Sequence, residues 1–197
     1  YKILHIGSYC TMDCAYCILQ TFFHPPILQY FVNKEDMFLE LDQFFKTTSH
    51  RRIGTGEYTD SLIWSQWTTL VENLVQRFAR QSRVALELKT KTNLVENLRN
   101  LEHNRKTILA WSLNAESVIR ENEIGTATLP ERLDAALRCQ EWGYPLAFHF
   151  DPIIIGDSCE NDYVAVIQQL FDRIAPDNIV WISLGTLRFM PALKPII

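Results

Sequence analysis

Short apolar runs alternate with longer amphipathic stretches along most of this chain. The runs are rich in β-branched and aromatic residues, and their length and composition are typical of buried strands in a parallel sheet. The predicted strands are Lys2–Ile6, Arg52–Thr55, Val84–Lys89, Thr107–Leu113, Leu146–Phe150 and Ile179–Leu184.

The stretches between these runs repeat apolar residues at helical spacing. One of them, Leu62–Ala79, is preceded by Ser61 as a candidate N-cap. Another begins with Pro130 and stops before Gly143, which are the usual signals for the start and the end of a helix. The predicted helices are Lys34–Phe45, Leu62–Ala79, Asn93–Leu101, Ser117–Glu123, Pro130–Trp142 and Asp162–Ile174.

Six strand–helix units predict an α/β domain with a parallel sheet and helices outside it. The choice lies between an open doubly wound sheet and a barrel. The chain has no G-x-G-x-x-G fingerprint, which weakens the dinucleotide-binding option. A full eight-fold barrel takes roughly 250 residues, so six units in 197 residues favour a partial (β/α)6 barrel of the TIM type. Its site should lie at the carboxyl ends of the strands.

Composition and charge narrow the class of protein. Hydrophobic residues make up 47% of the chain and charged residues 21%, as in ordinary globular proteins. No apolar run reaches the roughly 18–20 residues that span a bilayer, and no signal peptide opens the chain. We therefore expect a cytoplasmic protein without a membrane partner. The net charge of −4 does not indicate nucleic-acid binding, because a protein that binds a phosphate backbone usually has a basic face. A local basic groove can nevertheless exist on an acidic protein.

The chain is expected to form one domain over residues 1–197. It begins at Tyr1, already inside a β-like run (Tyr1–Ile6), and ends just after Pro195. We therefore expect a piece of a longer polypeptide, truncated at both ends.

Three of the five cysteines are crowded into the pattern Cys10-x3-Cys14-x2-Cys17, directly after the first predicted strand. An odd number of cysteines without an export signal favours metal-binding thiolates in a reducing compartment. A [4Fe–4S] cluster normally takes four thiolates, so three close cysteines leave one iron open. This spacing resembles the signature of radical S-adenosylmethionine (SAM) enzymes. In these enzymes the open iron holds SAM, and an electron from the cluster yields a 5′-deoxyadenosyl radical.

A structural zinc site is the alternative interpretation. The three cysteines together with His5 or His24 could form a closed Cys3His site. Zinc sites more often contain paired C-x2-C knuckles, so the spacing favours the cluster. Cys139 and Cys159 have no second cysteine nearby and are expected to fill core or surface positions.

The triad and a series of later strings together resemble the spore photoproduct lyase family of radical SAM enzymes. The strings occur in order from residue 10 to about residue 144, which makes them more specific than the triad alone. They are Tyr16, Leu19-Gln20-Thr21, Thr59-Asp60, Lys91, His103-Asn104, Lys106-Thr107, Ser112 with Asn114, Val118-Ile119, Glu123 with Gly125-Thr126, and Gly143-Tyr144.

The resemblance implies a partial barrel that holds a [4Fe–4S] cluster and SAM. Members of the family repair a thymine dimer of spore DNA by abstracting a hydrogen atom from the lesion. Cys10, Cys14 and Cys17 match the cluster ligands. The implied partners are damaged DNA and a flavodoxin- or ferredoxin-like electron donor.

The same resemblance gives roles to residues outside the triad. Lys91 and Ser112 match positions that contact the methionine part of SAM, with Asn114 close by. Tyr16 matches a tyrosine near SAM that passes hydrogen during turnover.

One departure from the family limits the substrate assignment. The lyase keeps a hydrogen-donating cysteine just before its Thr-Ser-Asp string, and alignment of that string with Thr59-Asp60 puts Tyr58 there. A second family tyrosine after the triad is Ile18 in this chain. Because a tyrosine O–H can also donate a hydrogen atom, Tyr58 is a catalytic candidate. The change favours a lyase-like enzyme with an altered substrate; radical modification of a peptide or small metabolite is the alternative, and a non-catalytic zinc module the third.

Two predicted strands end in polar groups that suit SAM or a substrate. Glu57 ends a Gly54-Thr55-Gly56-Glu57 string resembling the Gly-Gly-Glu-like string that holds the SAM amino group, although a tight turn also needs such glycines. Lys89 and Lys91 share a strand face. They could offer cations to the SAM carboxylate or a substrate phosphate, or be solvated charges.

The next two strand ends carry similar candidates. Ser112 and Asn114 suit the carboxylate and ribose of SAM, or cap the following helix. His149 shares a face with Asp151 and is a candidate for adenine contact or proton transfer, or else a core histidine. Arg188 could meet a phosphate or be a surface charge.

An aromatic segment follows the triad, over residues 22–26 with Tyr30 and Phe31. Its rings could stack on bases of a nucleic acid. They could equally form a hydrophobic lid that keeps water from the radical, which is the favoured interpretation.

Overall fold

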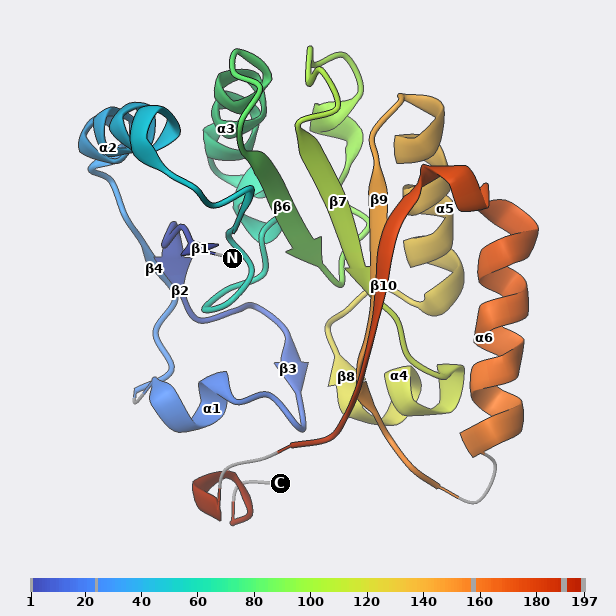
Figure 1. The fold of residues 1–197 in the computed structure, drawn as a ribbon. Helices are drawn as coiled ribbons and strands as arrows, with labels where there is room; N and C mark the ends of the chain where they lie inside the picture. Colours follow the sequence, from blue (N-terminus) through green and yellow to red (C-terminus); the bar gives the residue numbers. More distant parts are fainter. Residues whose placement is uncertain (1, 24, 157–158, 189–190, 196–197) are drawn as a thin grey trace.

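The computed structural model describes residues 2–23, 25–156, 159–188 and 191–195 (Figure 1). The strands are β1 Lys2–Ile3, β2 Gly7–Ser8, β3 Asp13–Cys14, β4 Gln29–Tyr30, β5 Arg52–Gly54, β6 Ala85–Thr90, β7 Thr107–Ser112, β8 Glu123–Ile124, β9 Leu146–Ile153 and β10 Ile179–Thr186. The α-helices are α1 Leu19–Phe22, α2 Lys34–Thr47, α3 Leu70–Ala79, α4 Glu116–Asn122, α5 Leu129–Glu141 and α6 Cys159–Arg173.

Six strands form one curled sheet in the order β1-β5-β6-β7-β9-β10, and every neighbouring pair is parallel. This spatial order is the order of the strands in the chain. A doubly wound sheet would reverse its strand order at a switch point, so the structure confirms the partial barrel. All six predicted strands are present, and β1 and β10 form the two edges of the sheet.

The outer face of the sheet builds the main core. Leu86 and Leu88 of β6, Trp111 of β7 and Phe148 of β9 are fully buried in one cluster that also contains apolar side chains of α3, α5 and α6. Burial of each such side chain contributes roughly 1.5–3 kcal/mol. Figure 1 shows these helices against one side of the sheet.

The inner face is lined by smaller side chains. Ile108, Ala110 and Ala147 form a separate small cluster, against which Ala85 and Trp181 pack. On this face, polar groups follow the cluster toward the carboxyl ends of the strands.

The predicted helix over Leu62–Ala79 is wrong in its first part. Ile63–Gln66 form a single 3-10 turn, and α3 begins only at Leu70. The Trp64 carbonyl accepts hydrogen bonds from both the Trp67 and Thr68 N–H groups, which closes the turn. Two threonines, whose β-branched side chains disfavour a helix interior, then precede α3.

The predicted helix over Asn93–Leu101 is also wrong, because only Glu96–Leu98 form a 3-10 turn there. Its apolar residues Val95 and Leu98 are buried all the same. The helix predicted to begin at Pro130 is confirmed as α5, with a capping box between Thr128 and Glu131 in front of it. Within the described parts of the chain, no helix combines the length and the apolar character needed to cross a membrane.

Candidate active site

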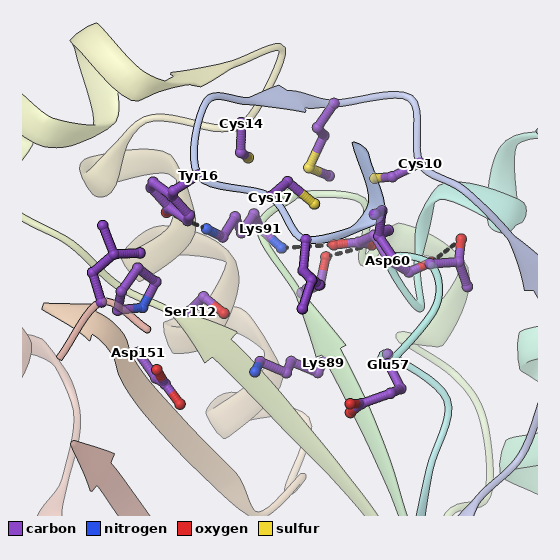
Figure 2. Close-up of a pocket in the computed structure, with 18 of the residues that line it drawn as sticks. Cys10, Cys14, Tyr16, Cys17, Glu57, Asp60, Lys89, Lys91, Ser112 and Asp151 are labelled. Atoms are coloured by element: carbon purple, nitrogen blue, oxygen red, sulfur yellow. Dashed lines mark hydrogen bonds between the residues drawn. The ribbon is translucent and has the colours of Figure 1, made fainter. Parts of the chain in front are cut away.

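A cavity of about 360 Å³ opens at the carboxyl ends of the strands, between the sheet and the cysteine loop (Figure 2). Its wall combines sulfur, charged and apolar side chains. The lining residues are Cys10, Met12, Cys14, Tyr16, Cys17, Ile18, Leu19, Gly56, Glu57, Thr59, Asp60, Lys89, Thr90, Lys91, Ser112, Asp151, Pro152, Leu187 and Arg188.

The cysteine loop follows β1 and is held by short-range and long-range contacts. Within the loop, the Cys17 N–H donates to the Cys14 carbonyl at 2.9 Å. The Gln20 side chain donates to the same carbonyl at 2.7 Å. In β3, Cys14 pairs antiparallel with Glu123 of β8. The loop is therefore fixed to a segment more than one hundred residues away in the chain.

The three sulfurs of the loop face one cavity, and their chemistry fits an iron–sulfur cluster. Burial raises the pKa of the Cys10 thiol to about 11 and that of Cys14 to about 12, and it also raises the pKa of Cys17. Binding of a metal centre would therefore release protons from these thiols. The positive charge of Lys91 favours the thiolates of both Cys14 and Cys17.

The same sulfurs do not form a ligand set for a single ion. No three His, Cys, Asp or Glu side chains among the described residues are grouped to hold one metal ion. In a [4Fe–4S] cluster each thiolate binds its own iron, so such a group is not required. Of the zinc alternative's histidines, His5 packs against Phe31 and Tyr58, and His24 lies outside the described residues.

Glu123 is the centre of a buried charge network beside the cysteines. Its Oε1 lies 3.0 Å from Lys91 Nζ, and its Oε2 lies 2.5 Å from an Arg132 guanidinium nitrogen. Burial opposes ionisation of Glu123, but the two cations and the hydrogen bonds from Tyr16 and Arg132 outweigh it and lower the pKa to about 2. The Lys91 ammonium is thus already paired before any ligand enters the cavity.

The Tyr16 hydroxyl completes this network. It donates to Glu123 Oε1 and accepts a hydrogen bond from Lys91 Nζ at 2.6 Å. Burial and, next, the Glu123 charge raise the pKa of Tyr16. The phenol therefore stays protonated at physiological pH, with its O–H held in the cavity wall.

Asp60 fixes the loop after β5 to the end of β6. Its buried carboxylate accepts from the Leu62 N–H at 2.9 Å, the Thr90 hydroxyl at 2.9 Å and the Lys91 N–H at 2.8 Å. The prediction of Ser61 as the N-cap is wrong, since Leu62 holds the N-cap position of the 3-10 turn and α3 begins only after Thr69. The Ser61 hydroxyl instead accepts from the Lys89 N–H at 3.0 Å.

Several candidates from the sequence line the side of the cavity away from the cysteines. Figure 2 shows Glu57, Lys89, Ser112 and Asp151 there, each from a different strand end or loop. Glu57 is exposed and Ser112 is buried. Asp151 pairs with Arg188 at 3.2 Å.

Two other predicted SAM ligands have their polar groups occupied elsewhere. The Asn114 amide donates to the Pro152 carbonyl at 3.1 Å and to Glu123 at 3.4 Å, while its oxygen accepts from Tyr163. Neither Asn114 nor His149 is among the residues that line the cavity.

Both ring nitrogens of His149 have protein partners. Nδ1 lies 2.6 Å from the Ser183 hydroxyl, and Nε2 lies 3.0 Å from Glu87 Oε1. Glu87 in turn pairs with Arg52 at 3.3 Å. This polar chain crosses the concave side of the sheet from β10 to β5.

Tyr58 lies beside the cavity and not in its lining. Its ring packs edge-on against the rings of His5 and Phe23, with 4.2 Å and 6.4 Å between the ring centroids. The aromatic segment after the cysteines therefore reaches Tyr58 through Phe23.

Sequence reasoning did not single out Glu123 and Arg132 as site residues. Glu123 occurred only within a string that carried the family resemblance, and Arg132 lay within the predicted helix Pro130–Trp142 without any role. Arg132 is in fact fully buried, and its guanidinium also donates to the Ser112 carbonyl at 2.9 Å.

Comparisons with known proteins agree on one family. The sequence model described as "Spore photoproduct lyase" matches residues 1–197. The spore photoproduct lyase of Bacillus subtilis (strain 168) is 30% identical over 173 residues, which are 86% of this chain and 50% of that protein. That of Geobacillus sp. (strain Y412MC61) is 28% identical over 84% of this chain and 49% of its own length. The chain spans about half the length of these relatives.

Solved structures show the same fold. A spore photoproduct lyase mutant with dinucleoside spore photoproduct has a TM-score of 0.90 at 26% identity, covering 97% of this chain and 57% of its own. Another mutant, with bound AdoMet and dinucleoside spore photoproduct, also has a TM-score of 0.90, at 24% identity, covering 98% and 58% of the two chains. Streptococcus suis SuiB bound to S-adenosylmethionine has a TM-score of 0.69 at 14% identity, covering 96% and 41%.

Proposed function

The chain belongs to the spore photoproduct lyase family, and on that premise we propose that it is a radical SAM enzyme acting on a nucleic-acid lesion. The observation that carries the proposal is the meeting of Cys10, Cys14 and Cys17 at one cavity with an anchored cation, Lys91. Three cysteines would leave one iron of a [4Fe–4S] cluster open for SAM. When bound, the cluster and SAM supply a 5′-deoxyadenosyl radical that takes a hydrogen atom from the substrate.

The residues of the chain have distinct roles in this proposal. Cys10, Cys14 and Cys17 hold the cluster, while Glu57 and Ser112 contact SAM from the side of the cavity away from the cysteines. Asp60 supports the first cysteine directly, because its backbone N–H donates to the Cys10 sulfur. These contacts orient the cofactor without any change in the fold.

Lys91 and Tyr16 act as a unit in the cavity wall. The Glu123 carboxylate keeps both in place. In that position Lys91 attracts the SAM carboxylate through its charge. The Tyr16 O–H lies in the same wall and passes a hydrogen atom during turnover. Met12, Ile18 and Leu19 add apolar surface that excludes water from the reacting groups.

The family indicates the class of substrate, and Tyr58 marks a difference in how this chain would donate hydrogen to it. Spore photoproduct lyases are described with a dinucleoside spore photoproduct bound. A pyrimidine lesion of DNA is accordingly the proposed substrate, with Tyr58 in the position of the hydrogen-donating cysteine. A low-potential donor of the flavodoxin or ferredoxin type and a reducing cytoplasm complete the proposal, because the thiols must stay reduced.

Anaerobic reconstitution of the protein tests the cofactor. The wild type should take up iron and sulfide, show the visible absorption of an iron–sulfur cluster, and form 5′-deoxyadenosine from SAM and dithionite. Cys14→Ala should lose both signals, whereas Cys159→Ala, on α6 away from the triad, should keep them. A Cys14→Ala variant with the wild-type yield of 5′-deoxyadenosine would overturn the cluster assignment.

Repair of ultraviolet-irradiated DNA tests the substrate. Wild-type protein with SAM and dithionite should restore thymine from the spore photoproduct, with one hydrogen taken from and returned to the lesion. A protein that forms 5′-deoxyadenosine but leaves every pyrimidine lesion intact would keep the radical chemistry and exclude the nucleic-acid substrate. A peptide or small-metabolite substrate would then be sought.

A further inference from the structure

The two lysines at the end of β6 differ in how much of their charge is available. Lys91 is paired with Glu123 at 3.0 Å and bonded to Tyr16 at 2.6 Å. Lys89 lines the same cavity, and its ammonium group makes no hydrogen bond or ion pair with any residue that the structure describes. Of the two lysines, Lys89 is therefore the one whose ammonium group can pair with a ligand in the cavity.

The backbone of Lys89 is fixed on both sides. Its N–H donates to the Ser61 hydroxyl at 3.0 Å, and its carbonyl accepts from the Ser61 N–H at 3.0 Å. Gly56 packs so closely that an added Cβ would lie 2.8 Å from Lys89 Cβ. The root of the side chain thus cannot shift, and only the flexible stem adjusts to a ligand.

Lys89 lies farther from the cluster cysteines than Lys91 does. Lys91 directly follows the last residue of β6 and lies two positions beyond Lys89, which corresponds to about 6–7 Å along an extended chain. Lys91 affects the ionisation of Cys14 and Cys17, whereas the charged neighbours of Lys89 are Asp151, Lys91, Glu87 and Glu57. Figure 2 shows Lys89 on the far side of Lys91 from the sulfurs, with its ammonium end toward Ser112 and Asp151.

SAM bound to an open iron of the cluster would have its carboxylate close to the cysteines, beside Lys91. A second anionic group, carried by the substrate and not by SAM, would then face Lys89. Within a nucleic-acid lesion the group of that charge is the phosphate that links the two nucleosides. A partly desolvated ammonium without a partner favours such an anion.

We propose that Lys89 binds the linking phosphate of the substrate dinucleotide and so makes this cavity selective for a lesion within a phosphodiester chain. This inference rests on the proposed function, of which it names the specificity-determining residue. The neighbouring carboxylates do not cancel the charge of Lys89. Asp151 is already paired with Arg188 at 3.2 Å and Glu87 with Arg52 at 3.3 Å, and Glu57 is exposed.

Titration of two synthetic ligands tests the proposal without turnover. They are the spore photoproduct as a dinucleotide with its linking phosphate and as the dinucleoside without it, each added to reconstituted, SAM-loaded protein. The wild type should bind the dinucleotide at least about tenfold more tightly, as expected for a charge-assisted hydrogen bond. Lys89→Met should bind both forms equally, and Lys89→Arg should recover the preference.

Lys46→Met is the matched control, because it removes one exposed lysine charge at the end of α2, away from the cavity. It should keep the wild-type preference, SAM affinity and 5′-deoxyadenosine yield. Equal binding of the two ligands by the wild type, or a loss of SAM affinity in Lys89→Met, would overturn the role of Lys89 alone. Absence of any lesion binding by a protein that still cleaves SAM would overturn the nucleic-acid assignment together with it.

Discussion

Lys91 and Glu123 form an ion pair next to the cysteine loop, with 3.0 Å between Nζ and Oε1 and with side chains that are 16% and 1% exposed. The pair joins the end of β6 to β8, which itself pairs with the strand that contains Cys14. Arg132 of α5 holds the other carboxylate oxygen at 2.5 Å. One glutamate therefore connects the wall of the cavity, the cysteine loop and a helix of the outer layer.

Glu123→Gln should lower the free energy of unfolding by about 3–5 kcal/mol. Removal of the charge leaves Lys91 and Arg132 buried without their anion, and an uncompensated buried charge is strongly destabilising. Urea unfolding of the full chain measures the change. Glu121→Gln is the control, since the Arg120–Glu121 pair on the surface is 71% and 63% exposed and should contribute less than about 1 kcal/mol. Equal effects of the two substitutions would contradict the assigned role of Glu123.

The contribution of Glu123 should depend on pH in one direction. Its pKa in the folded protein is about 2, below the ordinary value near 4.3 in an unfolded chain. The stabilisation is then fully present above about pH 4.5 and is lost as the pH falls toward 2. The difference in unfolding free energy between the wild type and Glu123→Gln should shrink across that window, by an amount on the order of 3 kcal/mol. A difference that stays constant from pH 6 to about pH 2.5 would show that the carboxylate is not held ionised by its partners.

Gly56→Ala should weaken SAM binding and destabilise the protein by about 1–3 kcal/mol, as overpacking usually does. A Cβ at this position would meet Lys89 Cβ at 2.8 Å and the Lys89 carbonyl at 3.1 Å. The loop would have to move and would displace Glu57 with it. Gly156→Ala is a matched control, because nothing lies within 4 Å of a Cβ there. Isothermal titration with SAM and thermal unfolding compare the two; indistinguishable variants would mean that the loop adapts at no cost.

Tyr58→Cys should raise the yield of repaired lesion for each SAM consumed by severalfold. A thiol donates a hydrogen atom to a carbon radical more readily than a phenol does, and the proposed function puts Tyr58 at the position of the family's hydrogen-donating cysteine. Tyr58→Phe, which keeps the ring packing on His5 and Phe23, should lower the yield. Quantitative product analysis measures both. A Tyr58→Phe variant as active as the wild type would show that the hydrogen donor lies elsewhere.

The sequence by itself determined the secondary structure of the sheet and the position of the cysteine triad. Each of the six strands was visible as a local apolar run. An inner strand such as β7 is buried on both faces, which requires continuous apolar residues, whereas the edge strands β1 and β10 are apolar although many of their side chains are exposed. The end of α5 was readable for a similar reason: Gly143 has a φ of +87°, a conformation that glycine adopts without strain. Signals of this kind depend only on neighbours along the chain.

The tertiary structure alone decided which charges are free in the cavity. The two lysines of the Lys89-Thr90-Lys91 string look alike in the sequence, and only the approach of Glu123 distinguishes them. That approach depends on the pairing of β3 with β8, across 107 positions between Tyr16 and Glu123. The same holds for the segment over residues 93–101, whose apolar spacing predicts a helix. Spacing records which side chains are buried, whereas the partner of a buried charge is fixed by where distant segments of the chain come together in space.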